Sequence, residues 1–238
     1  MSSKLLTETF QTVTLFKLLA IACLSLGYFT WSSVPRWRDL GTNSSKQAYV
    51  DLKNHCAHTF PIGASEYLRR HEALANVLLK LNASAYIAEP GASAAFYGNL
   101  STTNWRLSER PLLLIITAFG QSGESSKARA NVSVLTPKFE SARAKALPIP
   151  SADQVQYVEW PEDANPYAVA VEALSNKAGT IFVDSGIRKF IADGLQAALP
   201  NAKILSAPQE IAQLRERKSS AEINLLTCAN EVLLASFR

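Results

Sequence analysis

The chain has 238 residues, of which 47% are hydrophobic and 18% charged, so it can form one large or two small domains with a substantial core, and it is not a disordered chain. Most of the net charge of +4 comes from the first 38 residues, because the remainder carries 20 Lys and Arg against 19 Asp and Glu. This balance gives no support for a polyanionic partner, and we expect no binding to nucleic acid.

An apolar segment at residues 13–31 is the first element that the sequence predicts. Trp31 and Trp37 are residue types that suit a membrane interface, and no clear small-x-small cleavage motif follows the segment. These features favour an uncleaved signal anchor, with a cleaved signal peptide and a buried soluble helix as alternatives. We therefore assign residues 1–38 to a cytoplasmic tail with a signal anchor or signal peptide, and residues 39–64 to a polar stalk.

Four Asn-x-Ser glycosylation sequons follow the apolar segment, and they favour a lumenal or extracellular body. We accordingly expect a protein of the secretory pathway, membrane-anchored through residues 13–31 or secreted if the leader is cleaved. The candidate acceptors are Asn43, Asn82, Asn99 and Asn131.

Two cysteines, Cys56 and Cys228, lie outside the apolar segment. They could pair in an oxidising compartment, but they fall in different predicted modules. We expect two unpaired thiols, with a bridge as the alternative.

Alternating strand and helix patterns fill residues 65–214, and this alternation predicts an α/β sandwich with a mostly buried sheet. Ser65 is the expected cap of the first helix. A stretch of small residues after Gly91 leads to the aromatic residues at 96, 97 and 105. The predicted strands are 85–88, 112–119, 132–135, 155–160, 180–183 and 203–205, and the predicted helices are 65–82, 137–146, 166–176, 187–199 and 208–214.

The residues of this domain form no recognisable catalytic set. His55 and His58 flank a cysteine but have no fourth ligand at zinc spacing, and His71 lies on the apolar face of its predicted helix. Ser93 lacks the second glycine of a nucleophile elbow, and no histidine follows it. Asp184 begins an Asp-Ser-Gly sequence that reads as a capped turn between a strand and a helix.

One polar and aromatic cluster before a strand is the best candidate for a substrate-entrance or interface site. A packed turn at the entrance to the strand is the alternative. The cluster consists of Trp105, Arg106, Glu109 and Arg110.

Residues 215–238 are expected to form a linker and then a helix that opens a further domain. Ser219 or Ser220 can cap this helix, and Glu222 lies in its first turn. Its apolar residues need a partner surface to bury them.

The order and spacing of several segments resemble the amino-terminal domain of the creatinase, prolidase and Xaa-Pro aminopeptidase family. The resemblance runs from about residue 65 to the end of the chain. It rests on the helix with Arg69 or Arg70 followed by Leu74 and Leu78, the strand Ala85-Tyr86-Ile87, the turn Phe96-Tyr97-Gly98-Asn99-Leu100, the sequence Ser108-Glu109-Arg110-Pro111, and the closing segments Leu214-Arg215-x-x-Lys218-Ser219-x-x-Glu222-Ile223 and Ala229-Asn230-Glu231.

The resemblance implies a ribonuclease H-like mixed sheet flanked by helices, followed by a catalytic pita-bread domain with two divalent metals. Those metals would be held by two aspartates, a histidine and two glutamates, none of which can be assigned to this chain, since no histidine follows His71. We therefore expect no cofactor in this chain and no activity from it alone. The family's amino-terminal domain shapes the substrate entrance and contributes to subunit contacts, including those of a homodimer.

Two functional interpretations follow. In the first, the chain is the front part of a membrane-anchored metallopeptidase that acts on peptides, including X-Pro bonds. In the second, it is a complete non-enzymatic module that binds a partner or a catalytic paralogue through its terminal helix. The absence of a capping glycine after that helix favours the first interpretation.

Overall fold

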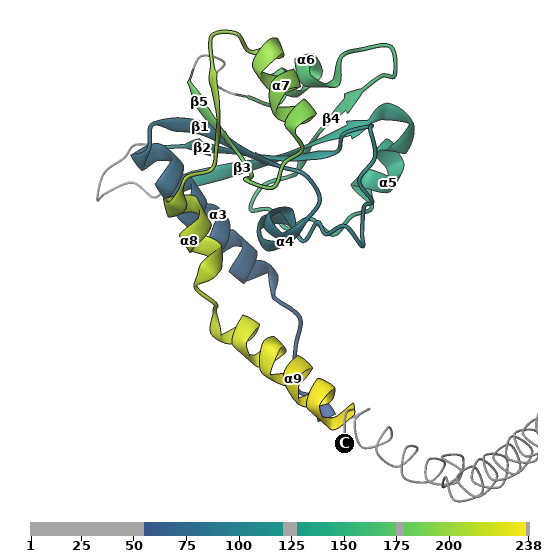
Figure 1. Cartoon of the computed structure of the whole chain (residues 1–238), viewed down its shortest axis with the longest axis vertical. Helices are drawn as coiled ribbons and strands as arrows, with labels where there is room; N and C mark the ends of the chain where they lie inside the picture. Colours follow the sequence, from purple (N-terminus) through teal and green to yellow (C-terminus); the bar gives the residue numbers. More distant parts are fainter. Residues whose placement is uncertain (1–54, 121–127, 175–178, 237–238) are drawn as a thin grey trace, which may run out of the picture. The chain divides into compact units, whose positions relative to one another are not determined.

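A mixed six-stranded sheet organises the part of the chain that the computed structural model describes, which comprises residues 55–120, 128–174 and 179–236 (Figure 1). The chain divides into two units, one of residues 1–58 with 230–238 and one of residues 59–229, and the sheet belongs to the second. The strands are β1 (Ala83–Ala88), β2 (Leu113–Phe119), β3 (Arg129–Pro137), β4 (Gln156–Trp160), β5 (Thr180–Val183) and β6 (Lys203–Ser206).

The strand order is β4-β3-β2-β1-β5-β6. β1, β2 and β3 form an antiparallel meander, whereas β4 pairs parallel to β3, and β5 pairs parallel to both β1 and β6. The centre of the sheet is apolar on both faces, as expected for strands covered by helices on either side.

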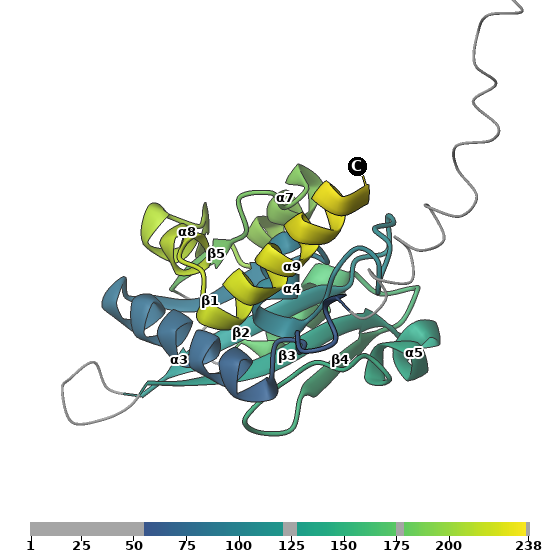
Figure 2. The same cartoon turned by 90° about the horizontal axis from the view of Figure 1, so that it is seen from below.

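Helices cover both faces of this sheet (Figures 1 and 2). α3, α4, α5 and α8 lie on one face, and α6 and α7 on the other. The described helices are α3 (Ala64–Lys80), α4 (Ala92–Gly98), α5 (Ser141–Lys145) with the 3-10 turn η1 (Lys138–Glu140), α6 (Pro166–Ala170) with η2 (Val171–Ala173), α7 (Lys189–Ala198), α8 (Gln209–Glu216) and α9 (Ser220–Ser236).

The two cores follow from the alternation of side chains along each strand. On β1, Tyr86 packs toward α3 and α4 with Leu74 and Ile211, while Ile87 packs toward α7 with Leu195. Each strand therefore contributes to two separate apolar layers, one on each side of the sheet.

The predicted α/β architecture is confirmed, and each predicted strand is present within a few residues of its expected bounds. The expectation that Ser65 caps the first helix was wrong, because Gly63 occupies the N-cap position without a side-chain hydrogen bond. The sequence prediction also missed α4, which occupies the stretch of small residues after Gly91.

Cys56 and Cys228 are both disulfide-bonded, so the expectation of two free thiols was wrong. The expected anchor at residues 13–31 and the acceptor Asn43 lie outside the described residues. Among the helices that are described, none is long and apolar enough to cross a bilayer.

Candidate functional site

Helix α4 separates a buried polar cluster from a surface pocket. Its seven residues end at Gly98, and the following residue, Asn99, adopts the left-handed conformation (φ 54°) and serves as the C-cap. Ser93 and Tyr97 point into the protein, while Ala92, Ala95, Phe96 and Asn99 line the pocket. The helical repeat thus gives this short element two distinct faces.

The inward face of α4 is tied to the turn after β5 through Asp184. The carboxylate of Asp184 accepts hydrogen bonds from the Tyr86 hydroxyl at 2.9 Å and from the Ser93 hydroxyl at 2.5 Å. It also accepts one from the backbone N–H of Gly186 at 3.3 Å, as expected for the predicted capped turn. Ser93 therefore joins α4 to β5, and the structure gives it no histidine partner among the described residues.

An ion pair between Glu89 and Arg188 stabilises the segment that follows β1. The buried carboxylate of Glu89, just after β1, accepts hydrogen bonds from the Arg188 guanidinium at 2.9 and 2.5 Å and from the Arg188 backbone N–H at 3.0 Å. Arg188 also donates to the carbonyl of Ser108 at 2.7 Å. Because these bonds hold the segments after β1, before β2 and before α7 together, we interpret this pair as structural.

The outward face of α4 borders a pocket of about 520 Å³. Tyr67 and Arg70 of α3 form one wall, and the end of α8 with the following linker forms another. The charged residues of the lining are Arg70, Arg215 and Lys218, opposed by Glu216 and Glu222, so the lining carries a surplus of one positive charge.

Arg70 is fixed in this pocket by two aromatic rings, a backbone carbonyl and two carboxylates. Its guanidinium lies over the ring of Phe96, 4.0 Å from the centroid, and 5.1 Å from that of Tyr67. Nε donates to Glu66 at 3.3 Å, and Nη1 donates to the Phe96 carbonyl at 2.8 Å. Nη2 is buried and has no hydrogen-bond partner among the described residues, but it forms an ion pair with Glu222 at 3.5 Å. A desolvated cation in this position strongly favours a nearby anion.

Glu222 links Arg70 to the start of α9. Its Oε2 accepts a hydrogen bond from the Ser219 backbone N–H at 3.0 Å, and its own N–H donates to the Ser219 hydroxyl at 3.3 Å. This reciprocal pair is a capping box and confirms Ser219 as a cap of the terminal helix.

Burial raises the pKa of Glu66, but hydrogen bonds from Arg69 and Ser219 and the charge of Arg70 outweigh it and leave this pKa below its usual value.

His71 and Tyr97 lie beneath the pocket in the apolar core. The Nε2 of His71 lies 2.6 Å from the carbonyl of Tyr97, and burial lowers the pKa of this histidine. The Tyr97 hydroxyl is buried and has no hydrogen-bond partner among the described residues, and burial raises its pKa. His71 is thus the packed residue that the sequence predicts.

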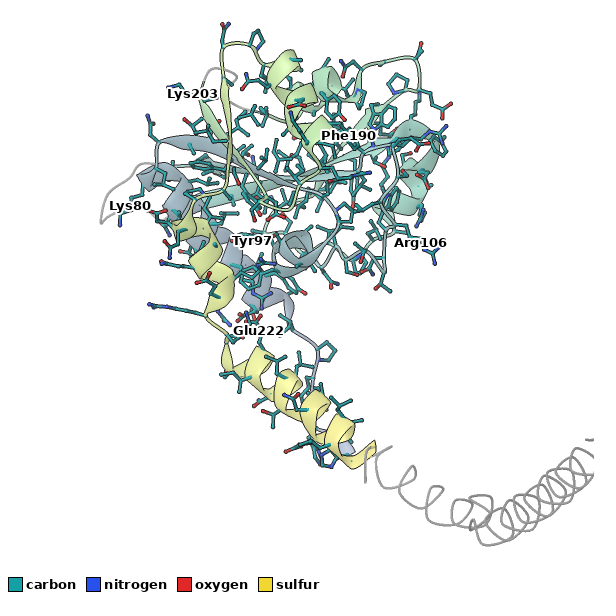
Figure 3. The ribbon with its side chains drawn as sticks, viewed as in Figure 1. Lys80, Tyr97, Arg106, Phe190, Lys203 and Glu222 are labelled. Carbon is teal, nitrogen blue, oxygen red and sulfur yellow. The ribbon has the colours of Figure 1, made fainter. Side chains whose placement is uncertain are left out.

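Of the four residues predicted as a substrate entrance, Arg106, Glu109 and Arg110 are exposed and Trp105 is buried, and no contact joins them all. Trp105 is buried beneath Arg143, whose guanidinium lies 4.2 Å from the indole centroid. Arg110 forms an ion pair with Glu162 at 3.2 Å. Arg106 and Glu109 are exposed, and Arg106 points outward in Figure 3.

The remaining predicted residues are also at the surface. Asn82, Asn99 and Asn131 are exposed. His55 and His58 are exposed as well, and His55 lies 2.8 Å from a carboxylate oxygen of Glu231. No group of three or more potential metal ligands exists within the described ranges.

The fold defines the chain as a mixed α/β domain of the kind found in dipeptidases. It matches dipeptidase PepE from Mycobacterium ulcerans with a TM-score of 0.57 and 22% identity, over 69% of this chain and 40% of that chain. The creatinase/prolidase N-terminal domain of an X-Pro dipeptidase from Streptococcus pyogenes aligns at a TM-score of 0.43 and 14% identity, over 61% of this chain and 98% of that one. No family model matches the chain.

In sequence, the chain is similar to an uncharacterised peptidase of Schizosaccharomyces pombe, with 30% identity over 230 residues. The alignment covers 94% of this chain and 50% of the relative, so the chain spans about half the length of the peptidase that it matches. The resemblance predicted from the sequence is confirmed to this extent: the chain is similar in sequence to a peptidase and in fold to a dipeptidase.

Proposed function

We propose that this chain serves as the non-catalytic amino-terminal domain of a creatinase or Xaa-Pro aminopeptidase-like metallopeptidase. The single observation that carries the proposal is the sequence alignment, which takes in nearly all of this chain but only half of the peptidase relative. The fold shared with a dipeptidase is consistent with it. Two divalent metals and the hydrolysis of peptides, including X-Pro bonds, would then belong to the parent enzyme.

In this role the domain would shape the substrate entrance and contribute to subunit contacts, including those of a homodimer. The exposed side chains of Arg106 and Glu109 are the surface residues to which we assign the entrance. Neither has a hydrogen bond or ion pair with another described residue, so both are available to contact a substrate or a neighbouring subunit.

The proposal is tested by measuring the mass of the native polypeptide and assaying it beside the 238-residue chain on X-Pro dipeptides with Mn²⁺. We expect a longer native polypeptide with metal-dependent activity, and no activity from the 238-residue chain. Hydrolysis by the 238-residue chain that is abolished by EDTA would overturn the proposal.

The entrance role has its own test in the native enzyme. Arg106→Ala and Glu109→Ala should change KM with little effect on kcat, because they would alter substrate access rather than bond cleavage. Lys189→Ala is the matched control, since Lys189 is exposed and, among the residues that the structure describes, bonds only Asp193 of its own helix.

A complete non-enzymatic interaction module is the second candidate, and one observation favours it. Four large apolar side chains of α9 are about half exposed or more. A native polypeptide of 238 residues that forms a stable complex through this helix would support the module. The four residues are Ile223, Leu226, Leu233 and Leu234.

A further inference from the structure

The pocket beside α4 combines free cationic groups with an apolar wall. Ile62, Ala92, Ala95 and the ring of Phe96 supply the apolar side. The volume of about 520 Å³ lies within the range of small-molecule sites in proteins. A ligand that fills this pocket would therefore need both an apolar group and a group that suits the charged side.

The three cations of the pocket differ in how closely carboxylates approach them. Arg215 is half-buried and has no carboxylate within 4 Å among the described residues, and Lys218 donates only to the backbone carbonyls of Arg215 and Glu216. Arg70 behind them adds a third positive charge, but this one is paired with Glu66 at 3.3 Å and with Glu222 at 3.5 Å, so Arg215 and Lys218 are the cations without a carboxylate partner among the described residues. The guanidinium of Arg215 can donate two parallel hydrogen bonds to one planar anion.

We propose that this pocket binds a small monocarboxylate that carries an apolar group next to its carboxylate. Arg215 and Lys218 hold the carboxylate, and the face of α4 around Ala95 and Phe96 receives the apolar group. The surplus of one positive charge in the lining suits an anion of charge −1 better than a dianion. This binding site goes beyond the proposed function and does not depend on it.

The experiment titrates the full chain with three probes at constant ionic strength, followed by NMR or calorimetry. N-acetyl-leucine offers a carboxylate with an apolar side chain, N-acetyl-leucinamide removes the charge, and inorganic phosphate supplies a compact dianion. We expect saturable binding of N-acetyl-leucine at concentrations up to about 10 mM, with no saturation by the amide and weaker binding of phosphate.

Two variants with opposite expected effects assign the binding to this pocket. Arg215→Ala should weaken the binding of N-acetyl-leucine about tenfold, because it removes a charge-assisted hydrogen bond. Glu216→Gln should strengthen it about twofold to fivefold, because it removes an opposing charge without changing the shape of the side chain. Lys189→Ala on α7, across the sheet from the pocket, should leave the affinity unchanged.

Equal binding of N-acetyl-leucine and its amide would overturn the proposal, and so would an affinity for phosphate that exceeds the affinity for the carboxylate. An unchanged affinity in Arg215→Ala, with the variant folded by circular dichroism, would also overturn it. Complete absence of binding by the native chain has the same consequence. None of these outcomes bears on whether the parent polypeptide is a peptidase.

Discussion

Nη2 of Arg70 lies 3.5 Å from Oε2 of Glu222 and joins the helix that begins the sheet domain to the helix that ends the described chain. The two residues are 152 positions apart in sequence. Because Glu222 also closes the capping box with Ser219, one carboxylate both pairs with a buried cation and caps α9.

The two roles of Glu222 can be separated by substitution. Glu222→Gln keeps a side-chain acceptor for the Ser219 N–H but removes the ion pair, whereas Glu222→Ala removes both. We expect the alanine variant to lose more stability than the glutamine variant in urea unfolding, by about 1 kcal/mol for the lost cap. Equal losses would mean that the capping contact contributes nothing measurable.

Arg70→Ala should destabilise the domain more than either change at Glu222, by about 3 kcal/mol, because it leaves two carboxylates without their buried partner. Arg70→Lys should rescue little, since a lysine cannot stack on Phe96 while also donating to Glu66 and to the Phe96 carbonyl. Arg69→Ala is the matched control on the same helix, because Arg69 is exposed. A loss at Arg69 as large as that at Arg70 would contradict this assignment.

Stability should depend on pH through His71. Burial lowers the folded-state pKa of His71 below 6.5, so the unfolded chain takes up a proton that the folded chain does not. The contribution is fully present above the unfolded pKa and is lost as pH falls below about 6.5. Glu66 acts in a separate window, since its lowered pKa costs stability only below about 4.5.

The measurement is the free energy of unfolding of the native chain and of His71→Gln, taken from neutral pH down to pH 5. This range lies above the pH at which Glu66 contributes. We expect the native chain to lose stability on acidification from neutral pH toward pH 5 and the variant to lose less. Parallel pH profiles for the two proteins would remove His71 as the source.

Gly98 is required by its close approach to Leu114. A Cβ at this position would lie 2.9 Å from one methyl group of Leu114 and 3.1 Å from the other, in a fully buried part of the core. We expect Gly98→Ala to cost about 1 to 3 kcal/mol through overpacking. Gly63→Ala, whose added Cβ would meet nothing closer than 4.0 Å, is the control.

A double-variant cycle identifies the clash as the cause. In a Leu114→Ala background the added methyl group has room, so Gly98→Ala should cost much less than it does in the native chain. Additive losses would indicate that the helix end itself, rather than Leu114, requires glycine.

From the sequence we expect the body of the protein to lie in the secretory pathway, and disulfide bonds such as those of Cys56 and Cys228 persist in oxidising compartments. Protein secreted from eukaryotic cells should therefore take up no iodoacetamide at either cysteine before reduction and should be labelled at both afterwards. Peptide mass spectrometry makes the measurement. Labelling of either residue before reduction would contradict the expectation.

The sequence allowed β2 and β5 to be predicted because each is a continuous run of apolar or β-branched residues. It did not allow α4 to be predicted, because this helix is short, Gly91 precedes it and Gly98 is its last residue. The strand order was also not predictable, since the pairing of β1 with β5 depends on contacts between segments almost a hundred residues apart.

The charged pocket was only partly predictable from the sequence. Arg69 and Arg70 are neighbours, and only the spacing of Tyr67, Arg70 and Leu74 on one face of α3 indicates which arginine is buried. Glu222 was predicted in the first turn of the terminal helix, but a local pattern carries no information about its partner on α3. The pocket exists because α3, α4 and α8 meet on one face of the sheet, which is a property of the tertiary fold.

The position of β1 has a consequence for how the domain assembles. Its antiparallel partner β2 begins at Leu113, after the connection that contains α4, whereas its parallel partner β5 pairs Ile87 with Val183, across almost a hundred intervening residues. Closing so long a loop costs entropy before any contact rewards it. During synthesis, the meander of β1, β2 and β3 can therefore form while one edge of the central strand waits, unpaired, for β5 to leave the ribosome.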